Sequence, residues 1–203
     1  MTNKLLIAIY DLLPKAIVKY MMNWKTREKI EVSKWLADQI EEHKDMLYQI
    51  LIDNDLIRRT NDATAIHILR WVHNKIRYQY DKTQYRTTEY WATVDETLSS
   101  GKGDCEDGAT LVYCLCRVAG IPKERIFLCA GDVEGGGHAW VRYLPEMYAV
   151  AVVYLDWCYW YDSNTIMKRK SYWDYYGNIE LPSNSKYKSI WFMANDESGF
   201  KWR

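Results

Sequence analysis

One cysteine lies at the start of a predicted buried helix, where a thiol could act as a nucleophile. Cys105 follows the stretch GKGD at 101–104, and nearly every residue over 109–119 is apolar. The partial positive charge of a helix N-terminus lowers a cysteine pKa, and its free backbone N–H groups can hold a developing oxyanion. Glu106 and Asp107 oppose thiolate formation, so an activated Cys105 needs a cation nearby, such as a protonated histidine.

Among the four histidines, His138 is the best candidate for a general base. It opens the predicted strand HAWVRYL directly after three glycines, so its ring can reach beyond the strand end. The other three lie on predicted helices among apolar or charged neighbours, which favours structural or surface roles for His43, His67 and His73. A strand histidine taken alone would be ordinary, and it is the helix-capping cysteine that makes His138 a base candidate.

A catalytic imidazole needs a group that orients it, and two aspartates are available. Asp156 and Asp162 lie in the next predicted strand, VAVVYLDWCYWYD, with the same face parity. Pairing His138 with Asp156 puts the hairpin turn at Met147 within LPEMY, whereas pairing it with Asp162 puts the turn at Val150 in an apolar run. We therefore predict Asp156 as the orienting residue, and Asp162 stays open as the alternative.

Three segments taken together resemble the transglutaminase-like superfamily within the papain-like cysteine protease fold. They are YWATVDETLSSGKGDCEDGATLVYCLCRVAGIP, GGGHAWVRY and VVYLDW, within residues 63–160. Cys105, His138 and Asp156 match, in this order, the family's helix-capping cysteine, strand histidine and following aspartate. The sequence LDWCYW departs from the family's commoner LDPT-type turn after that aspartate.

The resemblance implies a cysteine enzyme of the small microbial or viral type, with a Cys105–His138–Asp156 triad. Its oxyanion hole would combine the Cys105 backbone N–H with Trp91, the matching position in YWATVDETL. The implied chemistry is acyl transfer at an amide bond through a thioester. Peptide or isopeptide hydrolysis is the expected outcome, and protein-glutamine transamidation is the alternative. Because some members have lost catalysis, an inactive scaffold or binding protein is the third alternative.

The order of predicted elements indicates an α+β fold with an antiparallel sheet. Residues 1–60 show helical periodicity and are predicted to form a helical extension packed on the core, while residues 61–203 form the catalytic domain. Asp62 is the predicted N-cap of a helix over 63–81. Strands rich in β-branched and aromatic residues follow the cysteine helix, and the resemblance implies that this helix packs on their sheet.

Composition and charge indicate which kinds of molecule the protein is expected to bind. Lys plus Arg and Asp plus Glu both number 27, so no global field attracts nucleic acid. The five cysteines follow neither a disulfide framework nor a zinc-site spacing, and an EF-hand-type loop is missing, so we expect no metal or organic cofactor. We see no signal peptide or membrane-spanning segment and expect a cytoplasmic protein that acts on proteins or peptides. Virion association and the oligomeric state stay open.

Overall fold

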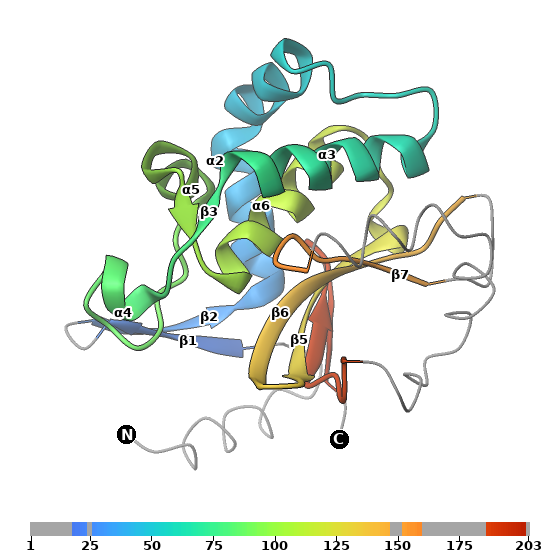
Figure 1. Cartoon of the computed structure of the whole chain (residues 1–203). Coiled ribbons are helices and arrows are strands. Elements are labelled where there is room, and N and C mark those ends of the chain that lie inside the picture. The colour runs from blue at the N-terminus through green and yellow to red at the C-terminus, as the bar shows by residue number, and fades with distance from the viewer. Residues whose placement is uncertain (1–17, 24–25, 147–151, 160–185, 202–203) are drawn as a thin grey trace.

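The computed structural model describes residues 18–23, 26–146, 152–159 and 186–201, and its architecture is α+β (Figure 1). Antiparallel strands form a five-stranded sheet in the order β7-β6-β5-β8-β9. These strands are β5 (Ile126–Val133), β6 (Gly136–Tyr143), β7 (Val153–Leu155), β8 (Phe192–Ala194) and β9 (Gly199–Lys201). Because β8 pairs with β5, a segment far along the chain completes the sheet beside the central hairpin.

Helix α6 (Cys105–Val118) occupies the centre of the molecule. It packs against α2 (Val32–Asp53) and α3 (Asn61–Lys75) and also against β5 and β6. Every residue over 106–116 is buried, because neighbouring elements surround this helix on most sides. The prediction of an α+β fold with a buried cysteine helix on an antiparallel sheet is confirmed.

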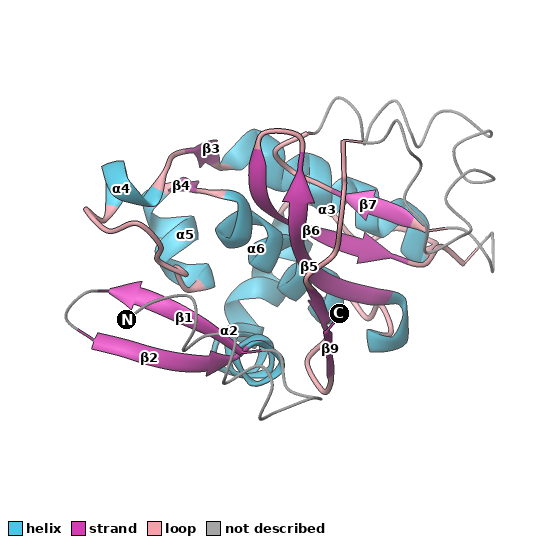
Figure 2. Ribbon diagram, turned by 90° about the horizontal axis from the view of Figure 1, so that it is seen from below, coloured by secondary structure: helices cyan, strands magenta, loops and turns pink. Residues whose placement is uncertain are grey.

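The N-terminal region differs in part from the predicted helical extension. β1 (Val18–Asn23) and β2 (Thr26–Glu31) form an antiparallel two-stranded sheet, so the helical prediction is wrong for these residues (Figure 2). The α2 helix does form, and its buried residues Val32, Leu36 and Leu51 belong to the same hydrophobic core as α6. The part predicted for residues 1–17 lies outside the described residues.

Short elements fix the loop that leads into α6. β3 (Arg77–Tyr78) pairs in parallel with β4 (Lys102–Gly103), which comes directly before the first turn of α6. Between them, α4 (Asp81–Gln84) follows β3, and α5 (Val94–Ser100) begins at a Thr93–Glu96 capping box. A 3₁₀ turn, η1 (Lys123–Arg125), connects α6 to β5.

The predicted limits of the helix over 63–81 are also wrong at both ends. Its N-cap is Thr60, whose Oγ1 accepts a hydrogen bond from the Ala63 N–H at 3.2 Å. Asp62 instead accepts a bond from the Tyr143 hydroxyl at 2.6 Å, because a distant strand brings that donor to it. The helix ends at Lys75, since the backbone that follows it pairs with β4.

The other face of the sheet carries a second, aromatic-rich core. It contains Phe127, Cys129, Val133, Trp140, Val152, Tyr154 and Tyr187. Since Tyr187 precedes β8, the chain after residue 185 contributes to this cluster as well as to the sheet. Among the described residues, no helix combines the length and the apolarity that crossing a membrane requires.

Candidate active site

Cys105 is the first residue of α6, where a thiol is expected to be activated by the helix N-terminus. In this structure, however, its Sγ donates a hydrogen bond to Glu106 Oε2 at 3.1 Å. Burial raises the pKa of the Cys105 thiol well above its ordinary value, and the charges of Glu106 and Asp104 raise it further. The sulfur is therefore a protonated thiol in this arrangement, and it needs a change in local charge to become a nucleophile.

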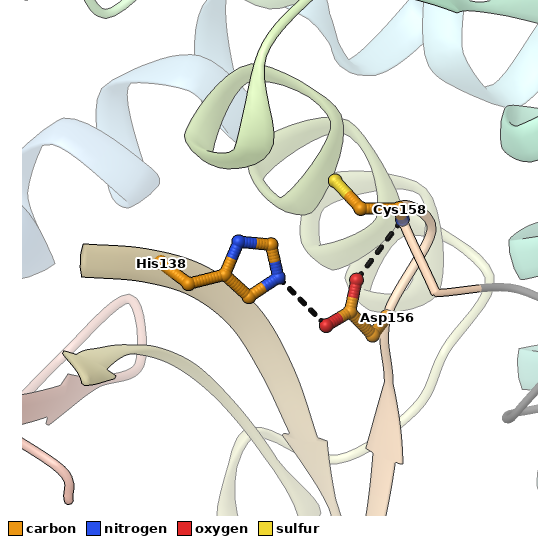
Figure 3. A group of neighbouring side chains, drawn as sticks. All are labelled: His138, Asp156 and Cys158. Carbon is orange, nitrogen blue, oxygen red and sulfur yellow. Dashed lines mark hydrogen bonds and ion pairs between the residues drawn. The ribbon is translucent and has the colours of Figure 1, made fainter. Parts of the chain in front are cut away.

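His138 and Asp156 form a buried hydrogen-bonded pair. His138 Nε2 lies 2.7 Å from Asp156 Oδ2, with His138 only 7% exposed and Asp156 fully buried. Figure 3 shows Nε2 facing the carboxylate and Nδ1 on the other side of the ring. Because a carboxylate accepts hydrogen, Nε2 carries the hydrogen and Nδ1 is left with its lone pair. This tautomer is the one in which Nδ1 can accept a proton.

Backbone and side-chain donors hold Asp156 in place from several directions. Its Oδ1 accepts hydrogen bonds from the N–H groups of Cys158 and Tyr159, at 2.9 and 3.2 Å. The hydroxyl of Tyr187 donates to Oδ2 at 2.7 Å. Sequence reasoning missed Tyr187, since it lies in the part of the chain that the resemblance does not cover and no local pattern links it to β7.

The pairing of β6 with β7 explains how His138 meets Asp156. Val141 lies opposite Leu155, so the same register carried to the strand end puts Cys158 opposite His138. Asp156 is therefore a diagonal neighbour, two residues away on the same face, which is within reach of an imidazole. The directly opposed pairing expected from the sequence is off by two residues, which leaves the side-chain face unchanged. Asp162 lies outside the described residues.

Trp157 connects α6 to the turn that contains Asp156. Its indole N–H donates to the backbone carbonyl of Cys105 at 3.3 Å, and its own carbonyl lies 2.9 Å from His73 Nδ1. The Trp157 ring also stacks on Tyr78, with centroids 5.8 Å apart. The described contacts thus join His138 directly to Asp156, and they join Cys105 to the same turn through its backbone.

Trp91, the other predicted oxyanion donor, is buried in the core at the segment before α5. Its indole Nε1 donates to Glu89 Oε1 at 3.3 Å. A role at the oxyanion would require this N–H to leave Glu89, so the assignment of Trp91 stays a prediction. The Cys105 backbone N–H, in contrast, lies at the first turn of α6, where helix N–H groups have no partner within the helix.

A buried carboxylate cluster surrounds the first turn of α6. Asp107 Oδ1 accepts from the Ala92 N–H at 2.9 Å, which ties the loop before α5 to the helix. Asp104 is 9% exposed, and within the described part of the chain no donor reaches its buried Oδ1. Burial and the neighbouring Glu106 raise the pKa of Asp104. Side-chain oxygens lie within 4.8 Å of one another in two overlapping groups, Asp81 with Asp104 and Asp107, and Asp81 with Glu89 and Glu106.

Comparison with known proteins agrees with this arrangement of helix and sheet. The model of a family described as the transglutaminase-like superfamily matches residues 55–164, which is more than half of the chain. The chain belongs to the transglutaminase-like superfamily. The match includes α3, α6, β5, β6 and β7, and therefore Cys105, His138 and Asp156.

Solved structures share the fold of this chain over more of its length than the family model matches. EGTA-treated LapG of Legionella pneumophila has a TM-score of 0.56 at 15% identity, over 81% of this chain and 86% of LapG. Calcium-bound LapG from the same organism has a TM-score of 0.55 at 16% identity, over 81% of this chain and 87% of LapG. Identities this low indicate a shared fold. No curated protein matches the sequence.

Gly108 lets the superfamily's cysteine helix approach Trp157 closely. A Cβ at position 108 would lie 2.2 Å from Trp157 Cε2, which forces the ring to move. We therefore expect Gly108→Ala to destabilise the protein by about 1–3 kcal/mol, as overpacking does, although alanine is the better helix former. Denaturant unfolding measures this change.

The double variant Gly108→Ala with Trp157→Leu is the control for that clash. If the clash causes the loss, the two changes together will destabilise less than the sum of the single variants. Strict additivity would contradict the close approach of Gly108 to Trp157.

The carboxylate cluster predicts a pH-dependent stability in this superfamily member. The pKa of Asp104 is raised in the folded state, so the unfolded chain releases this proton first as the pH rises above about 4. The protonated Asp104 therefore contributes its full stabilisation of the folded state below about pH 4, and this contribution is lost as the pH rises toward the raised pKa. In chelator-treated protein, thermal stability should therefore fall from about pH 5 to about pH 8, and less steeply in Asp104→Asn. Parallel curves for both proteins would show that Asp104 is not the group responsible.

Proposed function

We propose that the protein is a cysteine-dependent enzyme of acyl transfer at amide bonds, and that it hydrolyses a peptide or isopeptide bond. The observation that carries the proposal is the buried 2.7 Å hydrogen bond between His138 and Asp156, beside the turn that contacts the Cys105 backbone. Thiol catalysis requires a histidine oriented by a carboxylate together with a thiol, and the end of a helix is a position that activates a thiol. Membership of the transglutaminase-like superfamily supports the same reading.

The tautomer of His138 assigns its role in each step. Nδ1 accepts the thiol proton of Cys105, and the sulfur attacks the carbonyl carbon of the scissile amide. The imidazolium, stabilised by Asp156 through Nε2–H, then gives its proton to the leaving amine, and a thioester with Cys105 remains. Water activated by the same imidazole resolves the thioester, which releases the acid and restores the thiol.

The developing oxyanion lies at the start of α6 in this mechanism. The Cys105 backbone N–H points out of the helix terminus and can donate to the oxyanion, with the positive end of the helix dipole behind it. Trp91 is the second proposed donor, and it must first exchange Glu89 for the substrate oxygen. Removing one such donor reduces turnover by roughly 10²–10³-fold in enzymes of this kind.

A hard divalent cation fits the carboxylate cluster, and we propose calcium. A LapG structure is titled calcium-bound, and in this chain the donor set consists of oxygen atoms, among them the buried Asp104 Oδ1. Asp104, Glu106 and Asp81 would hold the ion, which supplies positive charge beside the thiol. Glu106 accepts the Cys105 S–H in this structure, so a Glu106 drawn away from the sulfur leaves that proton to His138.

The experiment that tests the function follows acyl transfer with and without an acceptor. Peptide and protein libraries are incubated with wild type, Cys105→Ala and His138→Ala, in calcium and with or without an added primary amine. Hydrolysis predicts new termini that depend on both residues and do not require the amine. Products that incorporate the amine would identify transamidation instead. Equal behaviour of the three proteins, together with slow alkylation of Cys105, would identify an inactive scaffold.

A further inference from the structure

Cys158 lies beside the His138–Asp156 pair, and the proposed mechanism does not use it. Its backbone N–H donates to Asp156 Oδ1 at 2.9 Å, so the turn after β7 fixes the residue next to the carboxylate. A ring nitrogen of His138, a carboxylate oxygen of Asp156 and the Cys158 sulfur all lie within 4.8 Å of one another. Figure 3 shows the three side chains converging from β6 and from the end of β7.

The three side chains form a donor set that suits a thiophilic cation. Thiolate, imidazole and carboxylate are the ligands of four-coordinate Zn²⁺, whose ligand distances of about 2.0–2.3 Å put donor atoms roughly 3–4 Å apart. The donor atoms of His138, Asp156 and Cys158 already lie within 4.8 Å of one another, which is close to the separation that a bound Zn²⁺ requires. The cluster at the start of α6 is mainly made of carboxylates, which suit a hard cation such as calcium, although the Cys105 sulfur also lies within 4.8 Å of oxygens of Asp104 and Glu106.

Further contacts support Asp156 from behind, as is usual around metal ligands. The Tyr187 hydroxyl and the Tyr159 N–H hold its two carboxylate oxygens, at 2.7 and 3.2 Å. Cys158 is partly exposed, whereas His138 and Asp156 are buried. Sequence spacing could not reveal this donor set, since its histidine and thiol are twenty residues apart and meet only through the β6–β7 pairing.

We propose that His138, Asp156 and Cys158 form a binding site for a thiophilic divalent cation, probed here with Zn²⁺, and that its occupation inhibits the enzyme. On binding, the Cys158 thiol loses its proton to solvent. The hydrogen on His138 Nε2 moves through solvent to Nδ1, so that the imidazole stays neutral, and the metal takes its place between Nε2 and Asp156. No bond to carbon changes and nothing is oxidised. Inhibition follows because the metal occupies the imidazole needed as a base, and this half of the inference depends on the proposed function.

The competing interpretation is that Cys158 only fills space. The side chain packs at the border of the main hydrophobic core, where a small apolar residue is ordinary. In that case a metal would bind no better to the wild type than to a variant that lacks the thiol. The two interpretations therefore differ in a direct binding measurement that needs no substrate.

The binding test titrates Co²⁺, as a spectroscopic substitute for Zn²⁺, into reduced wild type, Cys158→Ala and Cys105→Ala, each in saturating calcium. The site predicts one equivalent of Co²⁺ with a thiolate-to-cobalt charge-transfer band in wild type and in Cys105→Ala. It predicts loss of the band in Cys158→Ala, and displacement of the Co²⁺ by one equivalent of Zn²⁺. A band that persists in Cys158→Ala but disappears in Cys105→Ala, or no band in wild type, would overturn the site.

Cys158→Ser keeps the size of the side chain and guards against misfolding of the alanine variant. Its circular dichroism and unfolding temperature should match those of wild type, while the charge-transfer band is lost. In the amide-cleavage assay, the Zn²⁺ concentration for half-inhibition should rise at least tenfold in Cys158→Ser. Unchanged Zn²⁺ sensitivity would refute inhibition through this site. A wild type with the cobalt band but no amide cleavage would reject the proposed function and leave the site intact.

Discussion

Asp156→Asn should lower kcat by roughly 10⁴-fold and leave KM within about threefold. The reason is the tautomer. An asparagine can present its amide N–H to His138 Nε2, which moves the ring hydrogen to Nδ1, and Nδ1–H cannot accept the proton of Cys105. The substitution is nearly isosteric, so the contacts that an oxygen at this position accepts from the Cys158 and Tyr159 N–H groups can remain. Steady-state cleavage of a peptide substrate measures the effect.

Two aspartates serve as controls for this prediction. Asp132→Asn changes an exposed carboxylate at the end of β5, where it accepts from Ser189 and Trp191, and it should leave kcat within about twofold. Asp162→Asn tests the alternative orienting residue. A large loss in Asp162→Asn with near-normal activity in Asp156→Asn would exchange their roles. If neither aspartate matters, the triad itself is wrong.

Calcium should accelerate alkylation of Cys105 by iodoacetamide at pH 7 by tenfold or more. Without the ion, burial and the charges of Glu106 and Asp104 raise the thiol pKa, so almost no thiolate is present. Each unit by which bound positive charge lowers that pKa gives about ten times more thiolate below the pKa. Mass spectrometry of the Cys105 peptide, in chelator and in saturating calcium, measures the two rates.

Glu106→Gln separates the effect of the carboxylate from that of the ion. The amide removes the negative charge beside the sulfur, so alkylation in chelator should be faster than in wild type. Calcium should then add little, because the variant has lost a proposed ligand. Cys114, Cys116 and Cys129 are fully buried and provide internal controls, since their alkylation would report unfolding. If calorimetry shows that calcium binds but the alkylation rate of Cys105 in wild type is the same with and without calcium, activation through the carboxylate cluster is contradicted.

Local sequence was enough to predict the central part of the fold. The apolar run after Cys105 predicted a buried helix, and the change to β-branched and aromatic residues after it predicted the sheet. The choice of Asp156 as the partner of His138 depended on which hairpin turn was credible, and the structure contains that contact, although the register differs by two residues. Because side chains alternate between the two faces of a strand, a shift of two residues leaves His138 and Asp156 on the same face of the sheet.

Contacts between distant segments are what sequence reasoning could not reach. Aspartate is a residue type that often caps helices, yet in the folded protein the Asp62 carboxylate accepts a hydrogen bond from the Tyr143 hydroxyl. The sequence predicts helices over residues 1–60, but the two strands β1 and β2 form within this region. The carboxylate cluster combines Asp81 and Glu89 with the first turn of α6, and no motif spans that separation. In each case, contacts with a segment elsewhere in the chain, rather than the local sequence pattern, determine the structure.

The position of Tyr187 and β8 in the chain has a consequence for biosynthesis. A ribosome synthesises α6 and β6, the strand of His138, before it synthesises Tyr187, which hydrogen-bonds to Asp156, and β8, which pairs with β5. A nascent chain that has extended only through β7 therefore has an incomplete sheet and a carboxylate without its tyrosine. We therefore expect Asp156 to gain its full set of hydrogen bonds, and the sheet its β8 strand, only after translation has passed β8.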